Sequence, residues 1–156
     1  MELTVNDMTR EDIAPITEIN KLCFTRPWSA DALGAETQKD DAVFLTAWAD
    51  GEICGYGGFN YVLDEGYIAN IAVHPNMRRQ GVARCLLTEL AARADALDLS
   101  FLTLEVRASN LAAQRLYASA GFREVGRRKN FYEEIREDAL IMTKYLKLQE
   151  GEENED

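Results

Sequence analysis

A strand, helix, strand pattern over residues 67–106 constrains the fold of this chain more than any other feature. Apolar residues dominate a short run from Tyr67 to Val73, and a second run extends from Phe101 to Val106. Between them, residues 81–97 carry apolar side chains at helical spacing, namely Val82, Leu86, Leu87, Leu90, Ala91, Ala94 and Leu97. A unit of this kind belongs at the centre of a mixed sheet, with its helix covering one face.

The N-terminal segment predicts one strand and two helices. Residues 3–5 alternate between apolar and polar side chains, as in a short strand. Thr9 followed by Asp12 resembles an N-cap signature, so we expect a helix over about residues 10–22. Ser29 is a good N-cap for a second, shorter helix.

The rest of the chain adds strands, turns and a further helix. Asp50-Gly51 lies between apolar runs and is a strong hairpin signal, and Glu65-Gly66 stands near the next turn. Asn110 is the expected N-cap of a helix that ends near Gly121. The other predicted strands of this region are Ala42–Ala49, Glu52–Phe59 and Ala139–Leu148.

Together these elements predict a single α+β domain over residues 1–148, with a mixed sheet flanked by about four helices. A chain of 156 residues has about the length of one domain and forms one core. Residues 149–156 carry five of the negative charges behind the net charge of −10, and no apolar side chain. We expect them to form an acidic, disordered tail, because such segments cannot offset the entropy of ordering.

Composition argues against several classes of protein. No apolar run approaches a membrane span and the N-terminus lacks the apolar region of a signal peptide, so we expect a soluble, cytoplasmic protein without membrane contacts. Cys23, Cys54 and Cys85 form no CxxC pair, which predicts buried free thiols, no metal site and a reducing compartment. Without its tail the chain carries a net charge of about −5, which argues against nucleic acid as a direct partner and favours a cationic substrate.

The stretch from Asn70 to Leu87 predicts an anion site. A strand ends, a polar loop with several arginines follows, and Gly81 opens a helix whose first N–H groups are unpaired and lie at the positive end of the macrodipole. A pyrophosphate fits there, with charge added by Arg79 and Arg84. The alternative is an ordinary connection with solvated arginines. Neither a nucleotide P-loop nor a dinucleotide GxGxxG motif is present, which disfavours ATP and NAD.

Residues Arg78 to Ala83, RRQGVA, resemble the Q/R-x-x-G-x-G/A motif of the GNAT acetyltransferases. Downstream, the segments LEVRASN (104–110), LY (116–117), GF (121–122) and REDALIM (136–142) resemble the RimI branch of that family. This branch acetylates the N-terminal alanine of a small-subunit ribosomal protein. The similarity covers about residues 1–146. One departure is Phe131-Tyr132, where the branch commonly has two tyrosines.

The resemblance implies a GNAT fold that uses acetyl-CoA as co-substrate and no metal, with CoA in a cleft between two splayed central strands. It implies that the main-chain groups of Ile71, Ala72 and Val73 hold the pantetheine amides. The pyrophosphate would be held by Arg79, Gln80, Gly81, Val82, Ala83 and Arg84, and Asn110 would contact the cofactor arm. Direct transfer without an acetyl-enzyme is expected, because the motif positions contain no cysteine.

The resemblance also implies the catalytic pair. Alternation on its strand places Glu105 on the face opposite Leu104 and Val106, where it is either the general base or half of a surface Glu-Arg pair. Helical spacing places Tyr117 on a face similar to that of Asn110, where it is either a core aromatic or the acid that protonates the departing thiolate. With the resemblance, the catalytic roles are favoured.

The acceptor is expected near Trp28 and Tyr132, with Glu137 and Asp138 attracting a basic peptide. The resemblance points to the α-amine of a protein N-terminus, the N-terminal alanine of a basic ribosomal protein. Two alternatives remain open at this point. One is acetylation of a lysine or a small amine, and the other is a CoA-binding subunit without turnover of its own.

Overall fold

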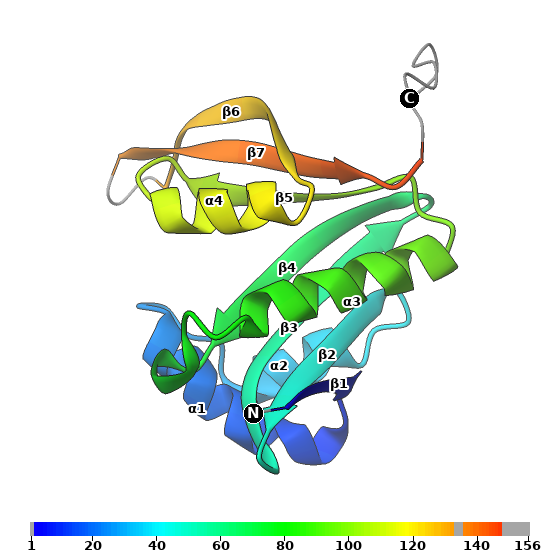
Figure 1. Cartoon of the computed structure of the whole chain (residues 1–156), viewed down its shortest axis with the longest axis vertical. Helices are drawn as coiled ribbons and strands as arrows, with labels where there is room; N and C mark the ends of the chain where they lie inside the picture. The colour runs from blue at the N-terminus through cyan, green and yellow to red at the C-terminus, as the bar shows by residue number, and fades with distance from the viewer. Residues whose placement is uncertain (1, 133–135, 148–156) are drawn as a thin grey trace.

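The computed structural model describes residues 2–132 and 136–147. Within them, a seven-stranded sheet has the strand order β1-β2-β3-β4-β5-β7-β6 (Figure 1). Its strands are β1 (Leu3–Asp7), β2 (Ala42–Ala49), β3 (Glu52–Val62), β4 (Glu65–Val73), β5 (Phe101–Arg107), β6 (Arg123–Tyr132) and β7 (Glu137–Tyr145). The helices are α1 (Ile13–Cys23), α2 (Ala30–Thr37), α3 (Val82–Ala96) and α4 (Leu111–Ser119), with short 3-10 turns at Arg10–Asp12 and Pro75–Met77. None of these helices is long and apolar enough to cross a membrane.

The helices cover the sheet on both faces. In Figure 1, α3 lies in front of the strands β1 to β4, and α1 and α2 lie behind them. The buried side chains of α3 form one apolar cluster with the sheet, and α4 packs against that same cluster. A second cluster, on the other face, joins α1 and α2 to β2, β3 and β4 through Ile16, Ile19, Leu33, Phe44, Tyr56 and Ala72. The predicted mixed sheet with helices on its faces is confirmed.

The predicted strand, helix, strand unit is also confirmed as β4, α3 and β5, and β4 runs parallel to β5. The predicted caps are present as well. Ser29 Oγ accepts a hydrogen bond from the Ala32 N–H (3.1 Å), and Asn110 Oδ1 accepts one from the Ala113 N–H (3.1 Å). Gly121 follows α4 with a φ of +98°.

One strand, β6, escaped prediction, because its sequence lacks the pattern that reveals the others. It forms one edge of the sheet, and nearly all of its residues are exposed. Its ten residues, REVGRRKNFY, are mostly polar and show no apolar alternation. A strand of this kind exists because β7 supplies an antiparallel partner, not because its own side chains form a buried face.

The turn between β3 and β4 lies next to Glu65-Gly66, as predicted, but does not include these two residues. The two-residue connection is Leu63-Asp64, with Leu63 in the left-handed region (φ +55°), whereas Glu65-Gly66 already belongs to β4. Gly66 has a packing role instead. A Cβ atom there would stand 2.7 Å from Leu102 Cδ2, so the absence of a side chain allows β4 to approach β5 closely at this point.

The contact between β4 and β5 is short. Only Glu65, Gly66 and Tyr67 pair with β5, opposite Phe101 to Thr103. The register of β4 with β3 then shifts, because Phe59 pairs with Ile68 and Gly58 pairs with Asn70, so that Ala69 is skipped. A bulge bends the strand that contains it. Beyond this bulge β4 is paired with β3 alone, and the two central strands diverge as predicted.

A buried polar chain holds the diverging end of β4 against α1. The Tyr56 hydroxyl accepts hydrogen bonds from the side-chain amides of Asn20 on α1 and Asn70 on β4, the latter at 2.8 Å. Asn20 Oδ1 in turn accepts from the Trp28 N–H (2.7 Å). Burial raises the pKa of Tyr56 to about 12, so its hydroxyl is neutral throughout the physiological range. The chain thereby ties the loop before α2 to the bent strand.

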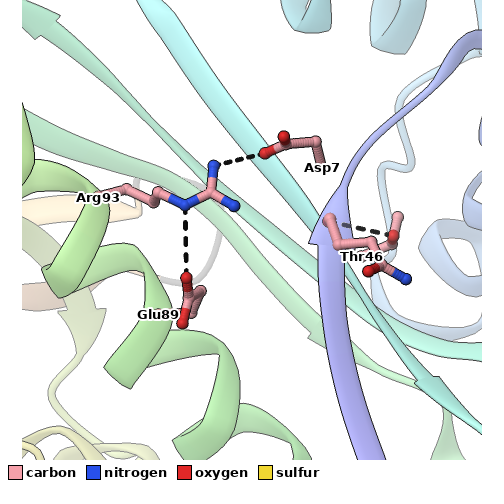
Figure 2. Close-up of polar contacts among 5 residues, drawn as sticks. Asp7, Thr46, Glu89 and Arg93 are labelled. Atoms are coloured by element: carbon pink, nitrogen blue, oxygen red, sulfur yellow. Dashed lines mark hydrogen bonds and ion pairs between the residues drawn. The ribbon is translucent and has the colours of Figure 1, made fainter.

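On the other face, an arginine of α3 contacts the edge strand β1, in addition to the apolar packing between these two elements. Figure 2 shows the Arg93 guanidinium between Asp7 of β1 and Glu89 of α3. Arg93 Nε lies 3.4 Å from Glu89 Oε1. All three side chains are partly exposed, so the contact orients α3 more than it stabilises the fold.

Gly58, at the bulge, provides a test of the packing. A Cβ atom at this position would overlap the ring of Phe44, a buried member of the second cluster. We expect Gly58→Ala to lower the free energy of unfolding by about 1–3 kcal/mol, measured by chemical denaturation. Gly34→Ala in α2, where the Cβ would meet no atom within 4 Å, is the control and should stabilise by about 0.5–1 kcal/mol. Equal effects of the two substitutions would contradict the packing described here.

Candidate functional site

A cavity of about 580 Å³ opens between the diverging end of β4, the start of α3 and the side of α4. Its position follows from the divergence of β4 and β5, because α4 stands beside the space that the strands leave. Of the ten residues predicted to bind the cofactor, nine line it: Ile71, Ala72, Val73, Arg79, Gly81, Val82, Ala83, Arg84 and Asn110. Gln80 lies in the same loop and is exposed, but it is not part of the cavity wall.

The loop before α3 has the geometry that the anion prediction requires. Arg79 and Gly81 both adopt left-handed φ values, +64° and +84°, and Gly81 is the N-cap of α3. The first N–H groups of the helix have no partners within it and lie at the positive end of its dipole. The guanidinium of Arg84 donates to Ser119 Oγ (3.3 Å), which connects α3 to α4 beside the cavity. The loop and the helix therefore combine backbone donors with nearby positive charge.

Several cavity residues escaped prediction, among them Cys23, Phe24, Met77 and Leu116. The Cys23 thiol donates to the Val73 carbonyl (3.3 Å) and lies 3.7 Å from Arg78 Nη2. Cys23 and Val73 are fifty residues apart in the sequence, so only the position of α1 in the fold brings the Cys23 thiol to β4. The prediction of buried thiols holds for Cys54, whereas Cys23 and Cys85 are partly exposed, so that part of it is wrong. All three are free.

The helix α4 contributes Asn110 and Tyr117 to the same cavity, so the prediction that they share a face is confirmed. Asn110 caps the helix. The ring of Tyr117 rests against Phe122, with a centroid distance of 6.0 Å. Burial raises the pKa of Tyr117, and the nearby Tyr132 raises it further. The phenol therefore keeps its proton at neutral pH and is available as a proton donor.

Glu105 does not line the cavity, but it lies on the side of β5 that the prediction gives it. The side chains of Leu104 and Val106 are buried, and Glu105 is exposed on the other face. Its Oε1 accepts a hydrogen bond from Arg128 Nη1 at 3.2 Å. The alternative given for Glu105, half of a surface Glu-Arg pair, is therefore observed, with an arginine of β6 as the partner. Arg107, on the same strand as Glu105, lies 5.3 Å over the ring of Tyr132 instead.

Tyr132 connects the two predicted catalytic groups. Partial burial raises the pKa of its phenol, the negative charge of Glu105 raises it further, and Arg107 opposes this effect. Tyr132 in turn influences the pKa of Tyr117. The base candidate on β5 and the acid candidate on α4 therefore both interact electrostatically with one common aromatic side chain.

The other predicted acceptor residues, Trp28, Glu137 and Asp138, each have a structural contact. Trp28 is half-buried against the second apolar cluster. Ser109 Oγ lies 2.8 and 2.6 Å from the two carboxylate oxygens of Glu137. Asp138 accepts hydrogen bonds from the Asn130 N–H (2.9 Å) and from Arg127 (3.3 Å), and the former lowers its pKa most. The contacts of Asp138 join β7 to β6, whereas those of Glu137 join β7 to the loop before α4.

Comparison with known proteins agrees with this geometry. The model of the acetyltransferase (GNAT) family matches residues 13–122, most of the chain. The chain belongs to the GNAT family. In this acetyltransferase, the segment Arg78 to Ala83 that resembles the family motif lies in the loop before α3 and at the start of that helix.

The relatives of this GNAT acetyltransferase include enzymes that modify ribosomal proteins. A candidate ribosomal protein bS18-alanine N-acetyltransferase of Bacillus subtilis (strain 168) is 39% identical over 88% of this chain and 92% of its own length. The crystal structure of the ribosomal-protein-S18-alanine N-acetyltransferase from Escherichia coli superposes with a TM-score of 0.86, at 33% identity over 98% of both chains. An acetyltransferase of Salmonella typhimurium, solved with acetyl-CoA, shares the fold (TM-score 0.84, 20% identity, 99% of both chains). The predicted RimI-like resemblance is confirmed.

Gly81 allows a test of the anion site. A side chain there would meet no atom within 4 Å, so valine would act through the backbone, since a β-branched residue strongly disfavours a φ of +84°. We expect Gly81→Val to weaken CoA binding by roughly 10- to 100-fold, because restoring the loop would cost about 1–3 kcal/mol. Calorimetric titration with CoA measures this change.

A matched control exists in the β2–β3 hairpin. Gly51 has a nearly equal φ of +80°, also with no atom within 4 Å, and is remote from the cavity. Gly51→Val should strain the backbone similarly and leave CoA affinity unchanged. Equal CoA affinity in folded Gly81→Val protein would show that the pyrophosphate binds elsewhere.

Proposed function

We propose that this protein transfers the acetyl group of acetyl-CoA to the α-amine of a protein N-terminus, that of the N-terminal alanine of a small-subunit ribosomal protein. One observation carries the proposal. A cavity with a helix N-terminus and arginines at one end contains a protonated phenol, Tyr117, and an exposed carboxylate, Glu105, lies near it on the adjacent strand. This arrangement suits a thioester donor and an amine acceptor.

The residues around the cavity suit CoA. The unpaired N–H groups at the start of α3, with Arg79 and Arg84, would bind the pyrophosphate. The apolar walls formed by Ile71, Val82 and Leu116 suit an uncharged arm, and the main chain of β4 beyond the bulge offers hydrogen-bonding groups that β5 does not use. The thiol of Cys23 already donates to the Val73 carbonyl, which leaves that oxygen one further lone pair for the arm.

The chemistry requires three proton transfers. Glu105 would take a proton from the acceptor ammonium, directly or through a water molecule. The neutral amine then forms a bond to the thioester carbonyl carbon, and the carbon–sulfur bond breaks as Tyr117 gives its proton to the departing sulfur. The attacking nitrogen loses its second proton as the amide forms, and that proton returns to the Tyr117 phenolate, directly or through water. Transfer is direct in this scheme, without an acetyl group on Cys23 or any other side chain.

Two considerations favour an α-amine over a lysine side chain. With pKa values of about 7.8 and 10.4, roughly 14% of an α-amine but only about 0.04% of a lysine is neutral at pH 7. A single carboxylate can therefore deprotonate an α-ammonium much more easily than a lysine ammonium. In addition, the Bacillus subtilis and Escherichia coli relatives are both named as alanine N-acetyltransferases of a ribosomal protein. An acceptor of this kind places the reaction in the cytoplasm.

The first test concerns the acid. Tyr117→Phe removes only the hydroxyl, so we expect acetyl-CoA affinity to stay within a few-fold and turnover to fall by about 100-fold or more. Steady-state kinetics and calorimetry separate the two quantities. Unchanged turnover, with the chemical step rate-limiting, would exclude Tyr117 as the required proton donor.

The second test concerns the acceptor. One basic peptide containing a lysine is prepared with a free N-terminal alanine and, in a second version, with that amine blocked. We expect acetylation only of the peptide with the free N-terminal amine, because the α-amine is the nucleophile. Intact-mass measurement detects the added acetyl group. Equal rates for the two peptides would instead identify a lysine acetyltransferase, and no reaction with either would favour a small-amine acceptor.

A further inference from the structure

The ion pair between Glu105 and Arg128 crosses a whole strand. Glu105 is on β5 and Arg128 on β6, and β7 lies between them. In the sheet register Ala139 of β7 pairs with Arg107 on one side and Arg128 on the other. Ala139 is completely buried although the helices leave this face of the C-terminal strands open. A short side chain at this central position leaves room for Arg128 to extend across β7 to the carboxylate.

An aromatic ring holds Arg128 in this position. Its guanidinium carbon lies 4.4 Å from the centroid of the Phe131 ring, and Phe131 packs edge-to-face against Tyr132 with a centroid distance of 5.1 Å. Tyr132 also contacts Arg107, whose guanidinium carbon lies 5.3 Å from the centroid of the Tyr132 ring. Such cation–π contacts stabilise a guanidinium over an aromatic ring even at exposed sites. Phe131 serves here through the face of its ring, and for that purpose a tyrosine hydroxyl is not needed.

The contact leaves part of the carboxylate for the acceptor. In the described part of the chain, Arg128 donates to Oε1 of Glu105 alone, at 3.2 Å. The glutamate side chain is 37% exposed, so its second oxygen is within reach of solvent and of an entering amine. A glutamate on an open sheet face otherwise has several rotamers, only some of which direct an oxygen toward the cleft.

We propose that Arg128, held by the Phe131 ring, is a positioning residue for acetyl transfer: it binds one oxygen of Glu105 and leaves the other to accept the acceptor's proton. This inference rests on the proposed function, in which Glu105 is the base. Misplacement of a catalytic group by about an ångström can cost up to 100-fold in rate, so the role is measurable even though the ion pair itself is exposed.

The experiment compares Arg128→Gln with Arg123→Gln in the full-length protein. Arg123 is on the same strand and its guanidinium also lies over an aromatic ring, that of Tyr145, so the control removes the same charge from a similar environment away from Glu105. We expect Arg128→Gln to lower kcat by roughly 10-fold with the acceptor peptide, with CoA affinity unchanged, and Arg123→Gln to remain within about two-fold of wild type. Arg128→Lys, which keeps the charge, should recover part of kcat.

Phe131→Ala tests the ring separately. It leaves both charges in place and removes the surface that holds the guanidinium, so kcat should fall by less than in Arg128→Gln. Equal kcat values for Arg128→Gln and Arg123→Gln would overturn the proposal. A higher kcat in Arg128→Gln would also overturn it, because Arg128 would then compete with the acceptor amine instead of positioning the base.

A double variant separates this proposal from the one on which it rests. If Arg128 acts through Glu105, Arg128→Gln should cause no further loss of rate in a Glu105→Gln background. A further loss of about 10-fold there would mean that Arg128 contacts the acceptor itself, and the positioning role would be wrong. If Glu105→Gln alone has wild-type kcat, the base in the proposed function is wrong. If Glu105→Gln abolishes turnover and Arg128→Gln behaves as the control, only the inference about Arg128 fails.

Discussion

The bulge in β4 is the feature on which the rest of the site depends. A parallel pair normally continues along both strands, but here the skipped residue, Ala69, bends β4 away after three residues have paired with β5. The main-chain groups beyond the bulge are therefore released from the sheet on one side. They would be costly to bury unpaired, and a ligand that hydrogen-bonds to them removes that cost.

The bend has to be held, and the protein does so with a buried polar chain instead of apolar contacts alone. Asn20, Tyr56 and Asn70 connect α1, β3 and the bent part of β4, and the amide of Trp28 extends the chain into the loop before α2. Hydrogen-bonded groups of this kind accept only a narrow range of geometries. The cofactor side and the expected acceptor side of the cleft are thereby attached to one rigid unit.

The two proposed catalytic groups have opposite environments. Tyr117 is largely shielded from solvent within the cleft, and burial raises its pKa so that it stays protonated. Glu105 is exposed on the sheet and paired with an arginine. Separate environments for an acid and a base allow one site to donate and accept protons at the same pH. The neighbouring β6 contributes the aromatic and cationic side chains around the base, Arg128, Phe131 and Tyr132.

The sequence alone determined the central β4, α3, β5 unit, the helix caps and the residues of the CoA motif, because these depend on neighbours in the chain: periodicity, a capping side chain and a glycine at a left-handed position all act locally. It did not reveal β6, the Leu63-Asp64 turn or the place of Cys23 on the cavity wall. An exposed edge strand has no buried face to create a pattern, and leucine carries no turn signal. The partner of Glu105 likewise depends on long-range pairing, because Arg128 is 23 residues away in the chain and adjacent only after β7 has aligned with both β5 and β6. Tertiary structure alone decided these contacts, since side chains on different strands meet only when the sheet register is set.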